Sequence, residues 1–328
     1  MNYIKNIHIG GYNTGHVQGI AVDKERKYIY CSFTTCLIKA DMNGNVIGSV
    51  RGLAGHLGCI AYNEEDGRVY GSLEYKHDKI GQSILNRSEQ EDVTDGFYIA
   101  IFDVEKIDRM DMHAEESGIM TAVFLKEVLD DYTAKGHRYG CSGIDGTTFA
   151  PLPGDCSAKK YLYVAYGIYS DLTRTDNNNQ IIRRYDISDW GKYEHSLNQS
   201  NMHHYGPESC DDMYAVYTGN TKYGIQNLEY DPVTNWMFAA VYRGEKPEFP
   251  NYPMYVFELS QNTLSLAHIG NFDEASGIYG YDFPHGATGM ISLGDGYFYF
   301  SQEYKDENGY GTHIKLYKYD KENGFSEA

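Results

Sequence analysis

The sequence has neither a long apolar run nor an excess of basic charge. No stretch approaches the roughly 20 apolar residues that a membrane-spanning helix needs. Lysine and arginine number 28 against 46 aspartates and glutamates, which gives a formal net charge of -18. Nucleic acids are bound through Lys and Arg that displace counterions, and anionic membrane surfaces attract basic segments. We therefore expect neither partner, and the acidic balance suits cations or neutral small molecules.

Cysteine is sparse as well. The six cysteines, at positions 31, 36, 59, 141, 156 and 210, include no CxxC pair and no spacing typical of a disulfide framework. The first seven residues also lack the apolar run of a secretory leader. We expect a cytoplasmic protein whose cysteines are reduced core thiols.

Sequence fingerprints of several large enzyme classes are missing. The chain has no GxSxG elbow, no phosphate-binding loop of the GxxxxGK[ST] type and no dinucleotide fingerprint. We therefore expect no organic cofactor. The polar stretch 171–179 has a passing likeness to calcium loops but lacks their glycine and terminal glutamate, so we interpret it as a surface loop.

Tyrosine is abundant, with 32 residues against 2 tryptophans. Tyrosine has high strand propensity and joins an apolar ring to a polar tip. The abundance therefore indicates either packing between sheets or an aromatic surface on which sugars can stack.

A repeated unit dominates the chain. Its first copy, residues 17–33, reads as two strands of alternating character joined by the charged turn 23–26. Five copies of the first strand are predicted at 17–22, 57–62, 144–149, 225–230 and 287–292. Second strands follow at 28–33, 68–73, 161–166, 236–241 and 297–302, and third strands at 37–41, 97–103, 181–186, 254–258 and 314–320. Fourth strands are predicted at 46–50, 120–125, 213–218 and 264–269.

The fifth unit lacks a clear fourth strand, and the N-terminus carries a spare one at residues 3–9. We predict an all-β, five-bladed β-propeller over residues 1–328, a single domain whose ring is closed when the N-terminal strand completes the last blade. Closure removes the open sheet edge that would otherwise pair with other chains. Helical periodicity is weak, and one short helix is expected within residues 103–117.

The first unit carries the pattern G-I-A-V-D at residues 19–23, a strand ending in Asp41 and a Gly-Asn turn at 44–45. This pattern resembles blades of the NHL and gluconolactonase-like propellers. The resemblance implies the fold and no activity, because propellers host hydrolases, lyases and inert scaffolds.

Long loops are predicted to cluster at one mouth of the propeller. The loops 75–95, 167–179, 242–253 and 304–312 lie there, with the approaches 126–143 and 270–286. The opposite face has short turns except at 104–119 and 188–212. Variable loops on a rigid scaffold usually carry function, which makes the loop-rich mouth the candidate site.

Two glutamates, Glu74 and Glu303, end second strands in the same S-x-E-Y-K pattern at this mouth. They are candidates for acid–base catalysis or cation binding. The structural alternative is common repeat ancestry, with Lys76 and Lys305 as surface counter-charges.

Histidines stand just before three inner strands, at His16, His56 and His285. The entries of inner strands converge near the propeller axis, so these imidazoles are candidate ligands for one divalent metal ion, or acid–base groups. Alternatively, each histidine bonds a neighbouring backbone group. Aligning the repeats places a mostly polar ring around the axis, at Gln18, Gly58, Asp145, Gln226 and Thr288. Such a ring suits ordered water or one hard cation such as Ca²⁺.

Taken together, these features predict an enzyme of hydrolase or lyase type that acts on a small polar or carbohydrate-derived substrate. Tyr75, Tyr242 and Tyr304 would supply the binding surface together with Gln18, Asp145 and Gln226, and Arg243 would clamp an anionic group. The rival hypothesis is a non-catalytic propeller that binds a ligand or a protein at the same mouth. The oligomeric state does not follow from the sequence.

Overall fold

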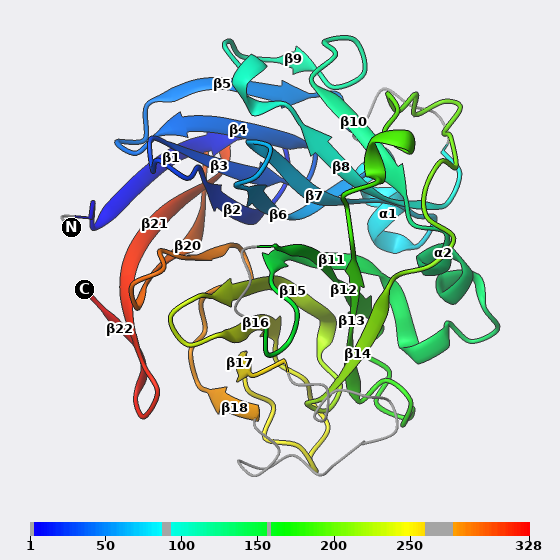
Figure 1. The fold of residues 1–328 in the computed structure, drawn as a ribbon, viewed down its shortest axis with the longest axis vertical. Helices are drawn as coiled ribbons and strands as arrows, with labels where there is room; N and C mark the ends of the chain where they lie inside the picture. The colour runs from blue at the N-terminus through cyan, green and yellow to red at the C-terminus, as the bar shows by residue number, and fades with distance from the viewer. Residues whose placement is uncertain (1–2, 87–92, 156–158, 260–277) are drawn as a thin grey trace.

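The computed structural model describes residues 3–86, 93–155, 159–259 and 278–328. Five antiparallel sheets surround a central axis and form the predicted five-bladed propeller (Figure 1). In four of the blades the strands follow one another outward from the axis in chain order, because segments of alternating apolar and polar residues pair with the next such segment along the chain.

The first three blades each contain four antiparallel strands. Blade 1 has β2 (Val17–Val22), β3 (Tyr28–Phe33), β4 (Cys36–Asp41) and β5 (Val46–Arg51). Blade 2 has β6 (His56–Asn63), β7 (Arg68–Tyr75), β8 (Gly96–Phe102) and β10 (Met120–Phe124). Blade 3 has β11 (Cys141–Ala150), β12 (Tyr161–Ile168), β13 (Asn179–Tyr185) and β14 (Asp212–Tyr217).

Blade 4 has β15 (Lys222–Asp231), β16 (Trp236–Tyr242), β17 (Met254–Phe257) and β18 (Ile278–Tyr281). The fourth strand predicted at 264–269 lies outside the described residues, and β18 occupies the outer position, inside a segment predicted as a loop. Strands this short are difficult to find in a sequence because alternation needs several residues to become visible.

Blade 5 closes the ring as predicted. It contains β19 (Met290–Ser292), β20 (Tyr297–Asp306) and β21 (Gly309–Asp320), and β1 (Asn6–Tyr12) pairs antiparallel with β21. The structure adds a strand that was not predicted, β22 (Gly324–Glu327), which pairs with the other end of β21. Both chain ends therefore lie at the outer edge of the same blade (Figure 1).

The two long connections on the far face cover outer strands. One short helix was predicted within residues 103–117. This segment instead contains a 3₁₀ turn at Val104–Lys106 and a short strand, β9 (Met112–His113), which pairs in parallel with β5 of blade 1. The connection 188–212 forms a bridge from His195 to Ala122 of blade 2. Both contacts cover edges that would otherwise present free backbone groups.

The apolar core lies between neighbouring blades. Each blade places one face of alternating side chains against the next blade, as Leu57 and Leu73 of blade 2 do against Leu37 of blade 1. The five described cysteines are free thiols, four of them buried, as predicted. Cys156 lies outside the described residues.

The axis is tightly filled at mid-height. A Cβ on Gly19 would lie 2.9 Å from the Cα of Cys59, so only glycine lets the inner strands of blades 1 and 2 approach this closely. Asn227 is fully buried, and its Nδ2 donates to the carbonyl oxygens of Gln18 (2.7 Å) and Ala287 (3.2 Å). These contacts leave separate hollows at the two mouths.

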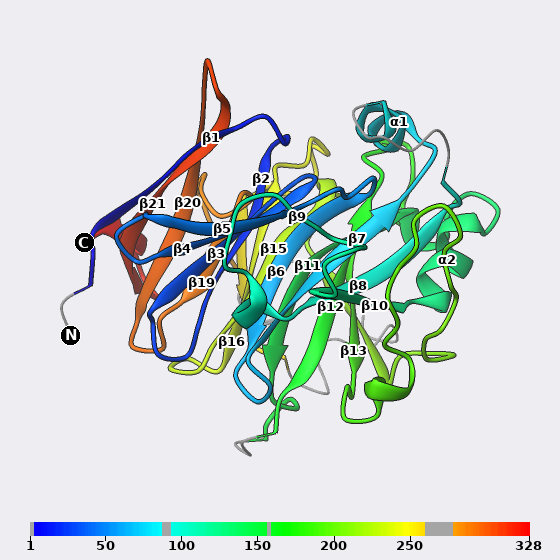
Figure 2. The ribbon, with the colours of Figure 1, turned by 90° about the horizontal axis from the view of Figure 1, so that it is seen from above.

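Two short helices lie in the connections of blades 2 and 3. They are α1 (Lys79–Leu85) and α2 (Lys126–Thr133). Figure 2 shows α1 and the β20–β21 hairpin projecting on the same face of the ring. No helix in the described ranges is long and apolar enough to span a membrane.

Candidate active site

A cavity of about 400 Å³ opens at the loop-rich mouth. Its wall is built by the first residues of the inner strands of blades 1 to 4, together with the start of α1. A cavity of this size is in the range that small-molecule sites occupy.

The same backbone irregularity occurs in four inner strands. The pairing register shifts between Val17 and Gly19 in β2 and between Leu57 and Ile60 in β6. It shifts again between Ile144 and Thr147 in β11, and between Ile225 and Asn227 in β15. β-Bulges of this kind redirect side chains, and they recur near functional sites. They fall at four of the five positions of the ring predicted around the axis.

Three members of that ring line the cavity, namely Gln18, Asp145 and Gln226. Gly58 leaves room for the Asp145 carboxylate, which a Cβ at this position would strike. Thr288 is outside the cavity lining and donates to the carbonyl oxygen of Ser301 at 3.0 Å. The ring therefore contributes three polar side chains to the cavity.

Asp145 is the carboxylate of the ring. It is 7% exposed, and its Oδ1 has no hydrogen-bond partner in the structure. Burial raises the pKa of Asp145 to about 7, while His56 opposes the shift and Glu74 adds to it. A carboxyl group that titrates near neutral pH in a cavity is a candidate acid or base.

His56 begins β6 and lies opposite Glu74 in the strand pairing. Its Nδ1 is 3.5 Å from Glu74 Oε1. Burial alone would lower the pKa of His56, but the carboxylates of Glu74 and Asp145 raise it overall. The His56 imidazole is therefore more easily protonated than in water, whereas the Asp145 carboxyl group in the same cavity is less easily ionised.

Glu74 is held by three groups. Its Oε1 lies 2.5 Å from Lys76 Nζ, and its Oε2 accepts from the backbone N–H of Ile144 at 3.0 Å. Burial would raise the pKa of Glu74, but Lys76 and His56 hold it below its usual value. Glu74 thus stays ionised and links blade 2 to the inner strand of blade 3.

Lys76 was interpreted from the sequence as a surface counter-charge, but the structure buries it. It is 6% exposed and donates to Ser142 O at 2.8 Å, with Asp78 Oδ2 at 3.7 Å. Burial would lower its pKa, but Glu74 and Asp78 raise it overall. The equivalent Lys305 is exposed and lies over the Tyr310 ring, so the two S-x-E-Y-K copies differ in environment.

Glu303, the second rim glutamate, has the same structural role at the ring closure. Its Oε1 is 2.9 Å from His16 Nδ1, and its Oε2 accepts from the backbone N–H of Val17 at 2.8 Å. His16 lines the cavity with a side chain that is 59% exposed.

The third predicted histidine, His285, lies apart from the other two. Its ring packs against Phe283 and Tyr317 of the blade 4–5 core and does not line the cavity. The chain before β19 is not a strand, since β19 begins only at Met290 rather than at the predicted residue 287. Within the described ranges, no group of three or more His, Cys, Asp or Glu side chains is arranged to hold a metal ion.

Among the predicted aromatic residues, Tyr242 lines the cavity. Tyr75 is buried between blades 1 and 2, where its hydroxyl donates to Gln199 Oε1 at 2.9 Å. Tyr304 lies at the outer side of blade 5, with its hydroxyl 2.8 Å from His8 Nε2. The structure places Tyr169 and Tyr223 at the cavity instead, and neither stands at a position that the strand repeat marks.

Arg243 is also directed away from the cavity. Its guanidinium pairs with Asp282 and donates to the carbonyl oxygen of Asn251 at 3.3 Å. The polar loop 171–179 is held by a buried lysine from outside it. The ammonium of Lys246 donates to Asn177 Oδ1 (3.0 Å), Asn178 Oδ1 (2.5 Å) and the carbonyl oxygen of Arg174. These three loop oxygens therefore already have a cationic partner from the protein itself.

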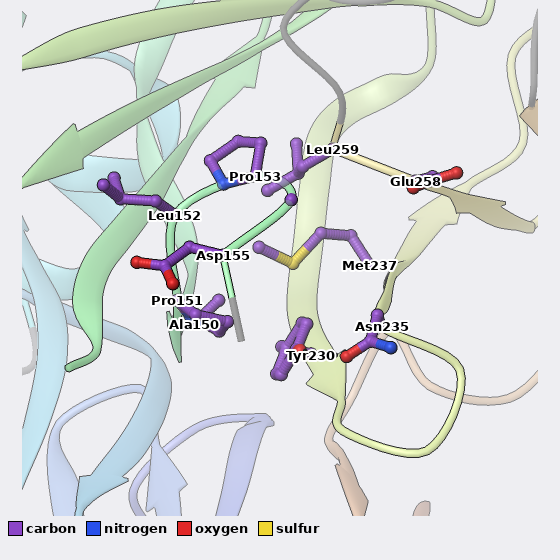
Figure 3. Close-up of a pocket in the computed structure, with 11 residues that line it drawn as sticks. Ala150, Pro151, Leu152, Pro153, Asp155, Tyr230, Asn235, Met237, Glu258 and Leu259 are labelled. Atoms are coloured by element: carbon purple, nitrogen blue, oxygen red, sulfur yellow. Dashed lines mark hydrogen bonds between the residues drawn. The ribbon is translucent and has the colours of Figure 1, made fainter. Parts of the chain in front are cut away.

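Two hollows lie at the opposite mouth. One, of about 270 Å³, contains Glu229, which accepts from Ser292 N at 3.0 Å and whose pKa burial raises to about 8. The other, of about 120 Å³, lies between the ends of blades 3 and 4, where Leu152, Pro153 and Met237 surround it (Figure 3). The strand pattern indicated neither hollow.

Comparisons with known proteins return only distant structural likenesses. No protein-family model and no curated protein sequence match the chain. A chain from a crystal structure of a nidogen/laminin complex is 12% identical with a TM-score of 0.40, covering 92% of this chain and 82% of that one. The soluble aldose sugar dehydrogenase from Escherichia coli is 9% identical with a TM-score of 0.42, covering 95% and 98%. A gluconolactonase from Xanthomonas campestris is 10% identical with a TM-score of 0.39, covering 93% and 77%. Likeness at this level transfers no site residue and no activity to this chain.

Proposed function

We propose that this protein is an enzyme of hydrolase or lyase type that acts on a small polar or carbohydrate-derived substrate in the axial cavity. The observation that carries the proposal is the pair His56 and Asp145. Both line one cavity of about 400 Å³, and the surroundings raise the pKa of each. Titratable groups whose surroundings tune their pKa in a shared cavity are typical of acid–base catalysis.

The roles follow from the two environments. With its pKa raised to about 7, Asp145 is partly ionised at neutral pH, and its unpartnered Oδ1 can accept a proton from a substrate or a water molecule. The ionised Glu74 favours the protonated form of His56, which gives a proton to the leaving oxygen. Lys76 keeps Glu74 ionised, so Glu74 and Lys76 are positioning residues.

The remaining wall suits a polar ligand. The amides of Gln18 and Gln226 can donate to and accept from hydroxyl groups, and the Tyr169, Tyr223 and Tyr242 rings give apolar faces. This combination of a few polar groups with aromatic rings is common in sites that bind sugars and related small molecules.

The test is turnover of a substrate panel by the wild type and two variants. A panel of sugar lactones, aryl glycosides and amino-sugar derivatives is assayed for hydrolysis and elimination. We expect His56→Gln and Asp145→Asn each to lower kcat/KM by about 10²-fold or more, with an acidic limb of the wild-type pH profile near 7 that Asp145→Asn abolishes. Turnover unaffected by both changes would refute the proposed roles.

Two other hypotheses give different results in the same experiments. A non-catalytic propeller would bind members of the panel without converting any of them. A divalent metal bound at the mouth would appear by elemental analysis of the purified protein and would be lost in a His16→Ala/His56→Ala variant. Proton transfer by His56 and Asp145 predicts that chelators leave turnover unchanged.

A further inference from the structure

Two tyrosines form an aromatic corner at the cavity mouth. The Tyr223 and Tyr242 rings lie at 89° with centroids 6.2 Å apart, and both residues line the cavity. They are 50% and 41% exposed, so their ring faces are open to a ligand. The same wall carries the ionisable side chains of His56, Glu74 and Asp145, so this corner is an aromatic surface beside ionisable groups.

The backbone at Tyr223 is strained. Its φ is +68°, a left-handed conformation that is unfavourable for a bulky residue. The pairing register of β15 with β16 is also irregular between Lys222 and Ile225. Glycine would relieve the strain at this position, yet the chain carries a half-exposed tyrosine. Strain of this kind is retained where it positions a functional side chain.

The electrostatics of the corner favour positive charge. The carboxylates of Asp145 and Glu303 both act on the Tyr242 hydroxyl and raise its pKa together with burial. Asp145 Oδ1 is buried in the cavity wall without a hydrogen-bond partner. Above pH 7, where Asp145 is mostly ionised, the cavity thus carries negative charge on the wall that the two tyrosine rings also line.

The nearby cations are already paired. Lys76 is the one lysine among the described lining residues, and Glu74, Asp78 and Ser142 O surround its ammonium. Outside the lining, Lys222 pairs with Glu245 and Arg243 pairs with Asp282. The two lining histidines also face carboxylates, His16 with Glu303 and His56 with Glu74. An anionic substrate group would therefore meet no cationic side chain of the described wall that lacks a carboxylate partner.

We infer that the substrate carries an organic ammonium group, which lies in the Tyr223–Tyr242 corner while the reacting part extends toward His56 and Asp145. The inference rests on the proposed function for the reacting part only. Aromatic faces attract ammonium groups, more strongly where a site is partly desolvated. The formal charge of -18 also favours the approach of cations from solution.

The test uses two probes of the same shape, choline and its neutral isostere 3,3-dimethylbutan-1-ol, titrated at low salt and pH 8. We expect choline to bind about tenfold more tightly than the isostere, and 0.3 M salt to weaken choline alone. Equal Kd values for the two probes, or tighter binding of the isostere, would overturn the inference, as would failure of choline to bind up to about 100 mM.

Variants locate the charge-dependent binding. Tyr223→Phe keeps the ring and should leave the Kd for choline within about threefold, whereas Tyr223→Leu should raise it about tenfold and leave the isostere unaffected. Tyr205→Leu, at an exposed tyrosine outside the cavity, is the matched control. If Tyr223→Leu and Tyr205→Leu bind choline alike, the corner is not the site.

The inference and the proposed function fail separately. His56→Gln should lower kcat/KM by about 10²-fold or more and retain choline binding, because His56 is not part of the corner. Choline binding without turnover of any substrate would leave the cation site standing and refute the enzyme. Turnover of neutral substrates, together with choline binding no tighter than that of its neutral isostere, would support the enzyme and refute the cation site.

Discussion

The Glu303 carboxylate on the last blade accepts a hydrogen bond from the backbone N–H of Val17 on the first blade, at 2.8 Å. Glu74 of blade 2 makes the same contact with Ile144 of blade 3, at 3.0 Å. The repeated rim glutamate therefore bonds the entry of the next inner strand, which gives the S-x-E-Y-K pattern a structural purpose in both blades. Blade 2 differs because Lys76 and His56 lie largely buried beside its glutamate, so charged groups form part of the cavity wall there.

Removing the Glu303 side chain should weaken the junction that closes the ring. Val17 is 1% exposed, so Glu303→Ala leaves its N–H without an acceptor, which costs about 1–3 kcal/mol of unfolding free energy. Glu303→Gln keeps an oxygen acceptor and should cost less than Glu303→Ala. Urea unfolding measures the difference, with Glu307→Ala at the exposed hairpin tip as control. If Glu303→Ala and Glu307→Ala unfold alike, the contact does not stabilise the closure.

Glu74 and Lys76 should show strong energetic coupling. Glu74→Ala leaves the 6%-exposed Lys76 ammonium without its nearest counter-charge, and breaking a buried pair in this way costs about 3–5 kcal/mol. Adding Lys76→Met removes the stranded charge, so the double variant should be more stable than Glu74→Ala alone. Unfolding of both single variants and the double variant completes the cycle. Additive losses would contradict coupling across this pair.

The N-terminal strand should matter more for closure than the C-terminal one. β1 places Ile7 and Ile9, at 1% and 0% exposure, in the core beside β21, whereas Phe325 of β22 is only partly buried. A variant beginning at Asn13 should lose several kcal/mol, at about 1.5–3 kcal/mol for each buried isoleucine, and should aggregate through the exposed β21 edge. A variant ending at Asn323 is the matched control and should remain monodisperse by light scattering. Similar behaviour of the two truncations would contradict this asymmetry.

The fold was predictable because every blade repeats the same local signals. The predicted segment 28–33 coincides with β3, and the N-terminal strand closes blade 5 as expected. The additional strands β9 and β22 escaped prediction. They have two and four residues, too few for alternation to show. β9 forms against the distant strand β5, and β22 folds back on the end of β21 across a short turn.

The site was predictable where it follows the repeat. Aligning the inner strands identified Gln18, Asp145 and Gln226, and a bulge at each of these positions places the side chain at the cavity. The position of Tyr223 at the cavity depends on its positive φ, and the burial of Lys76 depends on contact with Ser142 of the neighbouring blade. Neither feature can be predicted from a local sequence pattern.

The stability contributed by Asp145 should depend on pH in the direction opposite to that of a salt-bridged carboxylate. The group titrates at about 7 when folded and near 3.8 when exposed, so the folded state binds more protons between these values. The unfolding free energy therefore falls as pH rises from about 4 to 7, because ionised Asp145 is buried without a partner for Oδ1. Asp145→Asn should consequently be more stable than wild type at pH 8, by up to about 4 kcal/mol for a shift of roughly three pKa units. The gain should disappear near pH 4, where wild-type Asp145 is already protonated.

Urea unfolding of both proteins at pH 4.5 and 8 measures the difference, with Asp189→Asn at an exposed carboxylate as control. A gain that is equal at both pH values would show that the substitution acts through packing, and that Asp145 does not titrate near neutrality.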